Sequence, residues 1–146
     1  MSEPPQRILY WDASAILSVL FTDKHTDAAL AWSRRPDAHL LSSLAWAEVQ
    51  AVIARMVRQA EITTESAESA QKTLAAGPWR QVHTAPAWDL VRPLAARWPL
   101  RGADLWHLAL AKTLQAELPE IGLLTFDERL RAASATEGLA VDLAQA

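Results

Sequence analysis

The segment RILYWDASAIL, residues 7–17, sets the pattern from which the fold is predicted. Residues 7–11 form a short, largely apolar run of the kind found in buried strands, and Asp12 ends it. The residues that follow, 13–20, favour a helix. A buried strand that passes into a helix indicates a parallel sheet if the same alternation continues along the chain.

Strands and helices do alternate along the rest of the sequence. Further strands are predicted over residues 39–42, 80–83, 121–126 and 139–142. Helices are predicted over residues 26–33, 43–59 (with Ser43 as the N-cap), 64–77, 87–99, 102–116 and 128–135. Right-handed crossovers place helices on both faces of such a sheet. We therefore expect an α/β fold, a three-layer α/β/α sandwich with a central parallel sheet of four to five strands.

The length of 146 residues, with 51% hydrophobic and 21% charged residues, fits a single domain over residues 1–146, in which residues 1–6 form a flexible tail. The chain has no Cys, which excludes disulfides and zinc–thiolate sites. It has neither a membrane-spanning run nor the apolar core of a signal peptide, so we expect a cytoplasmic protein without membrane association. The net charge of -3 provides no general attraction for nucleic acid, whose binding would require a local patch or bound cations.

Four acidic residues fall at the carboxyl edge of the predicted sheet. Asp12 and Asp127 each directly follow a strand. Glu48 lies in the early turns of the helix that leaves the second strand, and Asp104 near the start of the helix that leads into residues 121–126. Ligands of parallel sheets bind at this edge. Clustered carboxylates stay charged together only when a cation offsets them, and their oxygens suit Mg²⁺ or Mn²⁺. The sequence therefore predicts metal-dependent phosphodiester hydrolysis.

Each acid also has an interpretation that needs no metal. Asp12 and Asp127 could be helix N-caps, and Asp104 could complement the dipole of its helix. Glu48 is harder to explain in this way because its neighbours at helical spacing are apolar, and a carboxylate beside a buried stripe is costly unless it is paired or bound to a metal. His107 lies one helical turn after Asp104, and we interpret it as a structural hydrogen-bonding residue.

The ordered set of motifs resembles that of PIN-domain ribonucleases. LYWDASAIL is similar to the first motif of that family, LLSSLAWAEVQAVIAR to the second, RGADLWHLALA to the third and LLTFDERLRAAS to the fourth. The resemblance covers nearly the whole chain, and the size and motif style are most similar to VapC-type toxins of toxin–antitoxin pairs. It implies an Mg²⁺-dependent endoribonuclease, usually dimeric, which a small antitoxin protein neutralises.

The resemblance also implies roles for the four acids. Asp12, Glu48, Asp104 and Asp127 would be the catalytic residues. Asp12 and Asp104 would be the main metal ligands. Glu48 and Asp127 would complete the acidic pocket, either directly or through water.

Residues around these acids receive supporting roles. By the same resemblance, Ser14 and Thr125 would orient the acids through hydrogen bonds. Arg101 could hold an RNA phosphate, or it could be a solvated surface charge. Trp side chains in the predicted helices are expected in the core or at a subunit interface. We expect a homodimer face around the helices at 64–76 and 87–98.

Two other classes of protein remain open. A receiver-like signalling module is also doubly wound with acids at one edge, but it has paired acids after the first strand and a Lys after the last. Here Trp11 precedes Asp12, and no Lys follows Asp142. A catalytically inactive PIN module would serve only in binding, and the presence of acids at all four positions argues against it.

Overall fold

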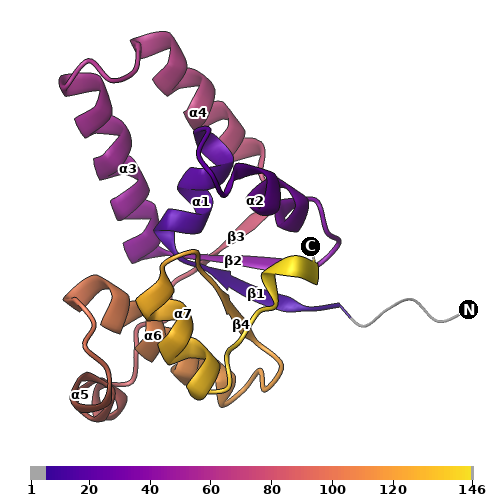
Figure 1. Ribbon diagram of the computed structural model, residues 1–146, viewed down its shortest axis with the longest axis vertical. Coiled ribbons are helices and arrows are strands. Elements are labelled where there is room, and N and C mark those ends of the chain that lie inside the picture. The colour runs from indigo at the N-terminus through magenta and orange to yellow at the C-terminus, as the bar shows by residue number, and fades with distance from the viewer. Residues whose placement is uncertain (1–5, 146) are drawn as a thin grey trace, which may run out of the picture.

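The computed structural model describes residues 6–145, which fold around one sheet of four strands (Figure 1). The strands are β1 (Ile8–Trp11), β2 (Ala38–Ser42), β3 (Trp79–Val82) and β4 (Gly122–Leu124). Their order is β3-β2-β1-β4, and every neighbouring pair is parallel. β1 therefore lies inside the sheet between β2 and β4, so that Asp12 leaves the sheet from its interior.

The described helices cover both faces of this sheet. They are α1 (Ala13–Leu20), α2 (Thr26–Ser33), α3 (Ser43–Arg58), α4 (Thr64–Ala76), α5 (Trp88–Arg97), α6 (Gly102–Gln115) and α7 (Glu128–Thr136), followed by the short 3-10 helix η1 (Leu143–Gln145). Figure 1 shows α1 to α4 on one side of the sheet and α5 to α7 on the other. The predicted three-layer α/β/α sandwich is confirmed.

The interior strand β1 shows why the sequence forms two cores. Successive residues of a strand point to opposite faces of the sheet. Leu9 and Trp11 pack with α1 to α4, whereas Tyr10 packs with α5 to α7, and all three side chains are buried. Because both faces are covered, the strand is apolar throughout and does not alternate with polar residues. Tyr10 carries a hydroxyl into the second core.

Helix caps form at the edge of the sheet where the acids lie. Asp12 caps α1 and Asp127 caps α7, each accepting a hydrogen bond of 2.9 Å from the backbone N–H three residues further on. The predicted cap of α3 at Ser43 is wrong by one position, because Ser42 Oγ accepts the capping hydrogen bond at 3.1 Å. Asp12 and Asp127 thus have the structural role expected of a cap, whatever chemistry they also perform.

The strand predicted over residues 139–142 is absent from the described part of the chain, so the sheet has four strands. The segment runs beside β4, but within residues 6–145 only one backbone hydrogen bond joins the two, from Leu123 N–H to the Leu139 carbonyl at 3.0 Å. Packing at Gly122 is so tight that an added Cβ would lie 2.5 Å from Val141 Cγ2. Side-chain contact, not a hydrogen-bonded ladder, therefore holds this segment.

Two further expectations concern α5 and the chain ends. α5 continues through Pro93 and ends at Arg97, before Pro99, which disfavours helical geometry in the residue ahead of it. Apart from Gln6, the predicted tail over residues 1–6 lies outside the described residues. No helix in residues 6–145 combines the length and apolarity required to cross a membrane.

Candidate active site

Asp12 is the most buried of the four acids, with 3% of its surface exposed. Ser14 Oγ donates to both of its carboxylate oxygens, at 2.8 and 2.9 Å, and Thr125 Oγ1 donates to Oδ2 at 2.6 Å. Burial raises the pKa of Asp12 above its ordinary value, and the hydrogen bonds from Thr125, the Ala15 N–H and Ser14 oppose that rise. The two residues expected to orient the acids therefore both contact Asp12.

Thr125 connects two of the acids. Its hydroxyl donates to Asp12 and accepts a hydrogen bond from the Asp127 N–H at 3.1 Å. Since β4 pairs directly with β1, the turn after β4 lies against the end of β1. The first and last acidic motifs of the sequence thus share one hydroxyl.

Asp104 and Asp127 line a common cavity of about 350 Å³. Arg101 and Arg129 line the same cavity. Burial raises the pKa of Asp104, and the negative charges of Asp127 and Glu48 raise it further. The positive charge of Arg101, which lines the same cavity, opposes this rise. The cavity thus combines acids that repel one another with arginines suited to phosphate.

Glu48 is half-buried and is paired with a histidine. Its Oε1 lies 2.6 Å from His107 Nε2, and His107 Nδ1 lies 2.5 Å from the hydroxyl of Tyr10. Tyr10 in turn donates to Ser42 Oγ at 2.7 Å. Burial raises the pKa of the Tyr10 hydroxyl, which stays protonated at neutral pH. The cost of placing a carboxylate beside an apolar stripe is thus offset by a buried polar chain.

The sequence interpretation of His107 as a hydrogen-bonding residue fits this geometry, but Tyr10 and Ser42 did not stand out as members of the site. Tyr10 belongs to a strand whose other residues are apolar, so periodicity assigns it to the core. One signal was available: a buried Tyr needs a partner for its hydroxyl, and His107 is the buried polar residue on α6.

The donor set suits a hard divalent cation. All four acids offer carboxylate oxygens, and their mutual repulsion, which raises the pKa of Asp104, is relieved by a positive charge. Within residues 6–145, no three Asp, Glu or His side chains stand close enough together to hold a metal ion by themselves. Such a closed cage is not required for Mg²⁺, which keeps several waters and commonly binds one or two carboxylates together with a substrate phosphate.

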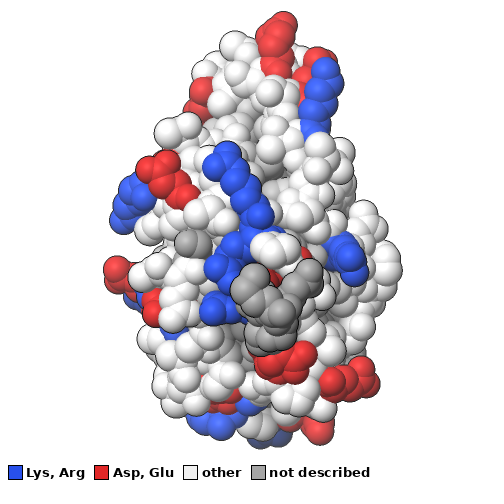
Figure 2. All heavy atoms as spheres, turned by 90° about the vertical axis from the view of Figure 1, so that its right-hand side faces the viewer, with Lys and Arg blue, Asp and Glu red and all other residues white. Residues whose placement is uncertain are grey.

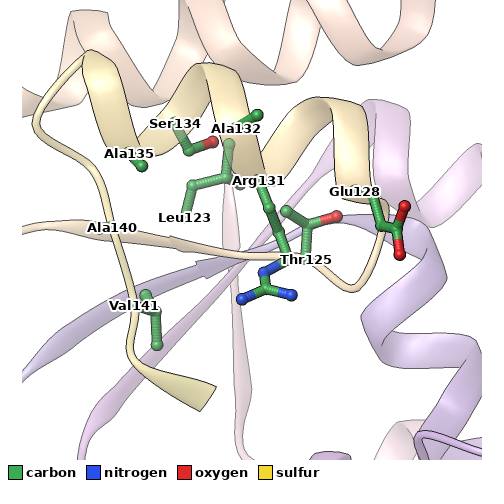
Figure 3. Close-up of a pocket in the computed structure, with 9 residues that line it drawn as sticks. All are labelled: Leu123, Thr125, Glu128, Arg131, Ala132, Ser134, Ala135, Ala140 and Val141. Carbon is green, nitrogen blue, oxygen red and sulfur yellow. The ribbon is translucent and has the colours of Figure 1, made fainter.

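A second cavity lies behind the acids. It has a volume of about 370 Å³ and lies between α7, the end of β4 and residues 140–141 (Figure 3). Thr125 lines it, and Figure 3 shows the Arg131 side chain extending from α7 alongside Thr125. Asp12, Glu48, Asp104 and Asp127 are not among its lining residues. We therefore assign it no part in the chemistry.

Basic side chains gather on the face where the described chain begins and ends (Figure 2). Arg7 and Arg35 lie ahead of β1 and β2, and their guanidinium groups stand 5.6 and 5.1 Å from the centre of the Trp32 ring. Both also contact Gln145 near the end of the chain. The amino ends of parallel strands lie opposite their carboxyl ends, so these arginines do not face the acids. They bind Gln145 and pack on Trp32 instead.

The fold agrees with comparisons to known proteins. The PIN domain family model matches residues 9–135, which is most of the chain. The chain therefore belongs to the PIN domain family.

Within that family the chain is a VapC-type protein. It is 30% identical over 151 aligned residues to Ribonuclease VapC45 of Mycobacterium tuberculosis (strain CDC 1551 / Oshkosh), and the match covers 94% of this chain and 96% of the relative. The same values hold for Ribonuclease VapC49 of Mycobacterium tuberculosis (strain ATCC 25618 / H37Rv).

Two solved structures share the fold. PAE2754 from Pyrobaculum aerophilum superimposes with a TM-score of 0.64 at 19% identity, covering 95% of this chain and 91% of the other. VapC20 of Mycobacterium tuberculosis, a sarcin–ricin-loop-cleaving toxin, superimposes with a TM-score of 0.57 at 16% identity, covering 86% of this chain and 94% of the other. The family resemblance of the sequence motifs is confirmed, and a receiver-like module is not favoured.

Proposed function

We propose that this protein is an Mg²⁺- or Mn²⁺-dependent endoribonuclease that hydrolyses RNA phosphodiester bonds as the toxin of a toxin–antitoxin pair. The observation that carries this proposal is that the acids lie at the carboxyl edge of a PIN-domain sheet, where Thr125 links Asp12 to Asp127 and one cavity is lined by Asp127, Asp104 and Arg101. Relatives named as VapC ribonucleases align along nearly the whole chain. The alternative of an inactive PIN module is less favoured because none of the four acids is missing.

Each acid has a distinct part in this proposal. Asp12, held by three donors, and Asp104, which shares a cavity with Asp127, would be the main metal ligands. Asp127 and Glu48 complete the ligand set directly or through water. These residues would hold Mg²⁺, and the chemistry it would supply is positive charge that favours ionisation of water and offsets the charge of the phosphate oxygens.

The protein's own residues position the substrate around these acids. Arg101 lies beside Asp104 on an open cavity and has no acidic ion-pair partner within residues 6–145, so its guanidinium is available to a phosphate. Ser14 and Thr125 keep Asp12 oriented. RNA is itself negatively charged, so this acidic pocket accepts it only with the cation in place.

The test is a cleavage assay on a mixed RNA pool with Mg²⁺ or Mn²⁺ against EDTA. We expect EDTA-sensitive cleavage that Asp12→Ala, Glu48→Ala, Asp104→Ala and Asp127→Ala each abolish or sharply reduce, with Asp12 and Asp104 the most sensitive. A matched control is Asp89→Ala, which removes an exposed acid in the first turn of α5. Cleavage that persists in EDTA, or that survives all four substitutions, contradicts the proposal.

We also propose a protein partner for the same pocket. Asp104 and Asp127 both line one cavity, so an Arg or Lys side chain of an antitoxin that enters it would supply their carboxylates with the positive charge that the metal otherwise provides. Because Asp127 is exposed, salt would screen this contact. Inhibition by a cognate antitoxin should therefore weaken as ionic strength rises, and RNA in the cytoplasm is the expected target of the free toxin.

The exposed surface supports a homodimer. Trp88 at the start of α5 is 92% exposed, and with Pro86, Val91 and Trp106 it lines an apolar cavity of about 460 Å³. An almost fully exposed aromatic side chain such as Trp88, beside such a cavity, is typical of subunit interfaces. Of the two helices expected at the dimer face, α5 and not α4 carries this feature.

A further inference from the structure

A chain of hydrogen bonds runs from the interior of the fold to one acid of the site. It starts at Ser42 at the end of β2, passes through the Tyr10 hydroxyl at 2.7 Å and His107 Nδ1 at 2.5 Å, and ends where His107 Nε2 lies 2.6 Å from Glu48 Oε1. Four separate elements, β2, β1, α6 and α3, contribute one residue each. The chain thus joins the central sheet to a helix on each of its faces.

Three residues of this hydrogen-bonded chain are buried, and the fourth, Glu48, is partly exposed. Ser42 and Tyr10 are fully buried, and His107 is 1% exposed, whereas 31% of the Glu48 side chain is exposed. Within residues 6–145, His107 is the only hydrogen-bond partner of the Glu48 carboxylate. A partly exposed Glu has many rotamers. A rigid partner at its inner side therefore decides where its carboxylate points.

A second buried histidine shows what a purely structural role looks like in this protein. His39 is also 1% exposed, and both of its ring nitrogens have partners at 3.0 Å. Those partners are Trp11 Nε1 and the backbone carbonyl of Arg35, and neither is an acid of the site. The His107 chain differs because it ends on a carboxylate whose charge acts on Asp104.

We propose that His107 is a positioning residue, which with Tyr10 behind it fixes the Glu48 carboxylate in the orientation that completes the acidic pocket. The proposal rests on the proposed metal-dependent nuclease function. In this role His107 acts through Glu48, which its Nε2 contacts. Partners that orient metal-binding carboxylates in this way typically change metal affinity or activity about 10–100-fold when they are removed.

Two substitutions at position 107 separate positioning from packing. In His107→Asn the amide occupies the place of Nδ1 and can meet Tyr10, but it does not reach Glu48. In His107→Gln the amide reaches the place of Nε2 and can still donate to Glu48. His39→Asn is the matched control, since it truncates an equally buried histidine whose partners are not acids of the site. Tyr10→Phe removes the hydroxyl that contacts His107 Nδ1, and it replaces His107→Asn in the test if that variant does not fold.

Binding of Mn²⁺, measured by the electron paramagnetic resonance signal of the free ion, is read beside RNA cleavage for each variant. We expect His107→Asn to lower Mn²⁺ affinity and kcat about tenfold or more with KM little changed. His107→Gln should retain most of both, and Tyr10→Phe should lie between them. In Glu48→Gln, adding His107→Asn should cause no further loss, because the two residues act as one unit.

Three results would overturn the proposal: wild-type Mn²⁺ affinity in folded His107→Asn, an equal loss in His39→Asn, or full additivity with Glu48→Gln. Failure of the proposed function has a different signature. If the wild type binds Mn²⁺ but cleaves no RNA, the nuclease proposal fails and the role of His107 is judged from the binding data. If the wild type does not bind Mn²⁺, both proposals fail.

Discussion

The hydroxyl of Thr125 donates a hydrogen bond of 2.6 Å to Asp12 Oδ2, across 113 positions of sequence. The bond joins the turn after β4 to the end of β1, two strands that are direct neighbours in the sheet. Asp12 is therefore held by the tertiary fold as well as by its own helix cap. The orientation of the most buried acid depends on correct pairing between the first and last strands.

Thr125→Val tests this relationship. The substitution keeps the shape but removes the donor, so a buried carboxylate loses one partner. We expect a loss of about 1–3 kcal/mol in the free energy of unfolding and a drop in RNA cleavage of about 10–100-fold. Denaturant unfolding and the cleavage assay measure the two effects. Thr113→Val is the control, since it removes a part-buried hydroxyl on α6 that contacts no acid. Equal loss of cleavage in both variants contradicts the prediction.

Asp104 makes the metal-free protein sensitive to pH. Burial, and then the charges of Asp127 and Glu48, raise its pKa in the folded state. The folded state therefore binds the Asp104 proton more tightly than the unfolded state does. The stability that the protonated Asp104 carboxyl contributes is present at low pH and is lost as pH rises through its folded-state pKa. Asp104→Asn should flatten this dependence and raise Tm in EDTA at neutral pH.

The control for this experiment is Asp89→Asn. Asp89 is also an acid in the first turn of a helix, so its substitution reports the loss of a favourable interaction with the helix dipole alone. Thermal unfolding from about pH 4.5 to about pH 8 covers the relevant range. A lower Tm for Asp104→Asn than for the wild type at neutral pH would show that repulsion among the acids is not dominant.

Binding of a divalent ion should stabilise the wild-type protein by mass action. At a Mn²⁺ concentration 100 times its Kd, the gain is about 2.7 kcal/mol, which corresponds to a rise in Tm of about 5–10 °C for a domain of this size. The double variant Asp12→Asn, Asp104→Asn should respond little. An unchanged wild-type melting curve at millimolar Mn²⁺ would count against the site.

Trp88 tests the proposed dimer. Light scattering at tens of micromolar should show a dimer for the wild type and a monomer for Trp88→Glu, because a charge at the centre of an apolar interface is costly. Ser69→Glu places the same charge on an exposed position of α4, the other helix expected at a dimer face, and should leave the dimer intact. A monomeric wild type, or dissociation by Ser69→Glu alone, contradicts the assignment to α5.

Gly122 is predicted to be intolerant of even one methyl group. Gly122→Ala would place a Cβ 2.5 Å from Val141 Cγ2, and overpacking of this kind costs about 1–3 kcal/mol. Val141→Ala should restore part of that loss in the double variant, since it removes the atom in conflict. Chemical denaturation of the two single variants and the double variant measures the coupling. Independent, additive effects would show that the segment can move away from β4.

The fold could be predicted largely from local signals. The apolar runs at 7–11 and 121–126, each followed by an acid and a helix, placed β1 and β4 correctly as strands of a parallel sheet. The last strand was predicted wrongly because residues 139–142 are apolar enough for a strand. In the described structure these residues lie against β4 and make one backbone hydrogen bond to it, from the Leu123 N–H to the Leu139 carbonyl, an arrangement that sequence periodicity does not report.

The residues of the candidate site could likewise be predicted from the sequence only in part. Asp12, Asp104 and Asp127 could be found because topology brings the ends of their elements to one edge. The pairing of Glu48 with His107 could not, since it depends on how α3 and α6 pack across the sheet edge. The motif at Asp104 placed His107 nearby but gave no sign of Tyr10, whose hydroxyl becomes important only through a neighbour 97 positions away.

The sheet order β3-β2-β1-β4 has a consequence for synthesis of the chain. Three of the four acids can be translated while β1 still lacks its neighbour on one side, because β4 begins at Gly122. Until that strand leaves the ribosome and pairs, Asp12 has no Thr125 and the pocket has no Asp127. On the proposed function, a chain in which β4 has not yet paired would therefore have an incomplete acidic pocket and would not cleave RNA. Pairing of β4 with β1 would then be the folding step that completes the pocket, and an inhibitor already present at that step would meet the proposed toxin as it becomes active.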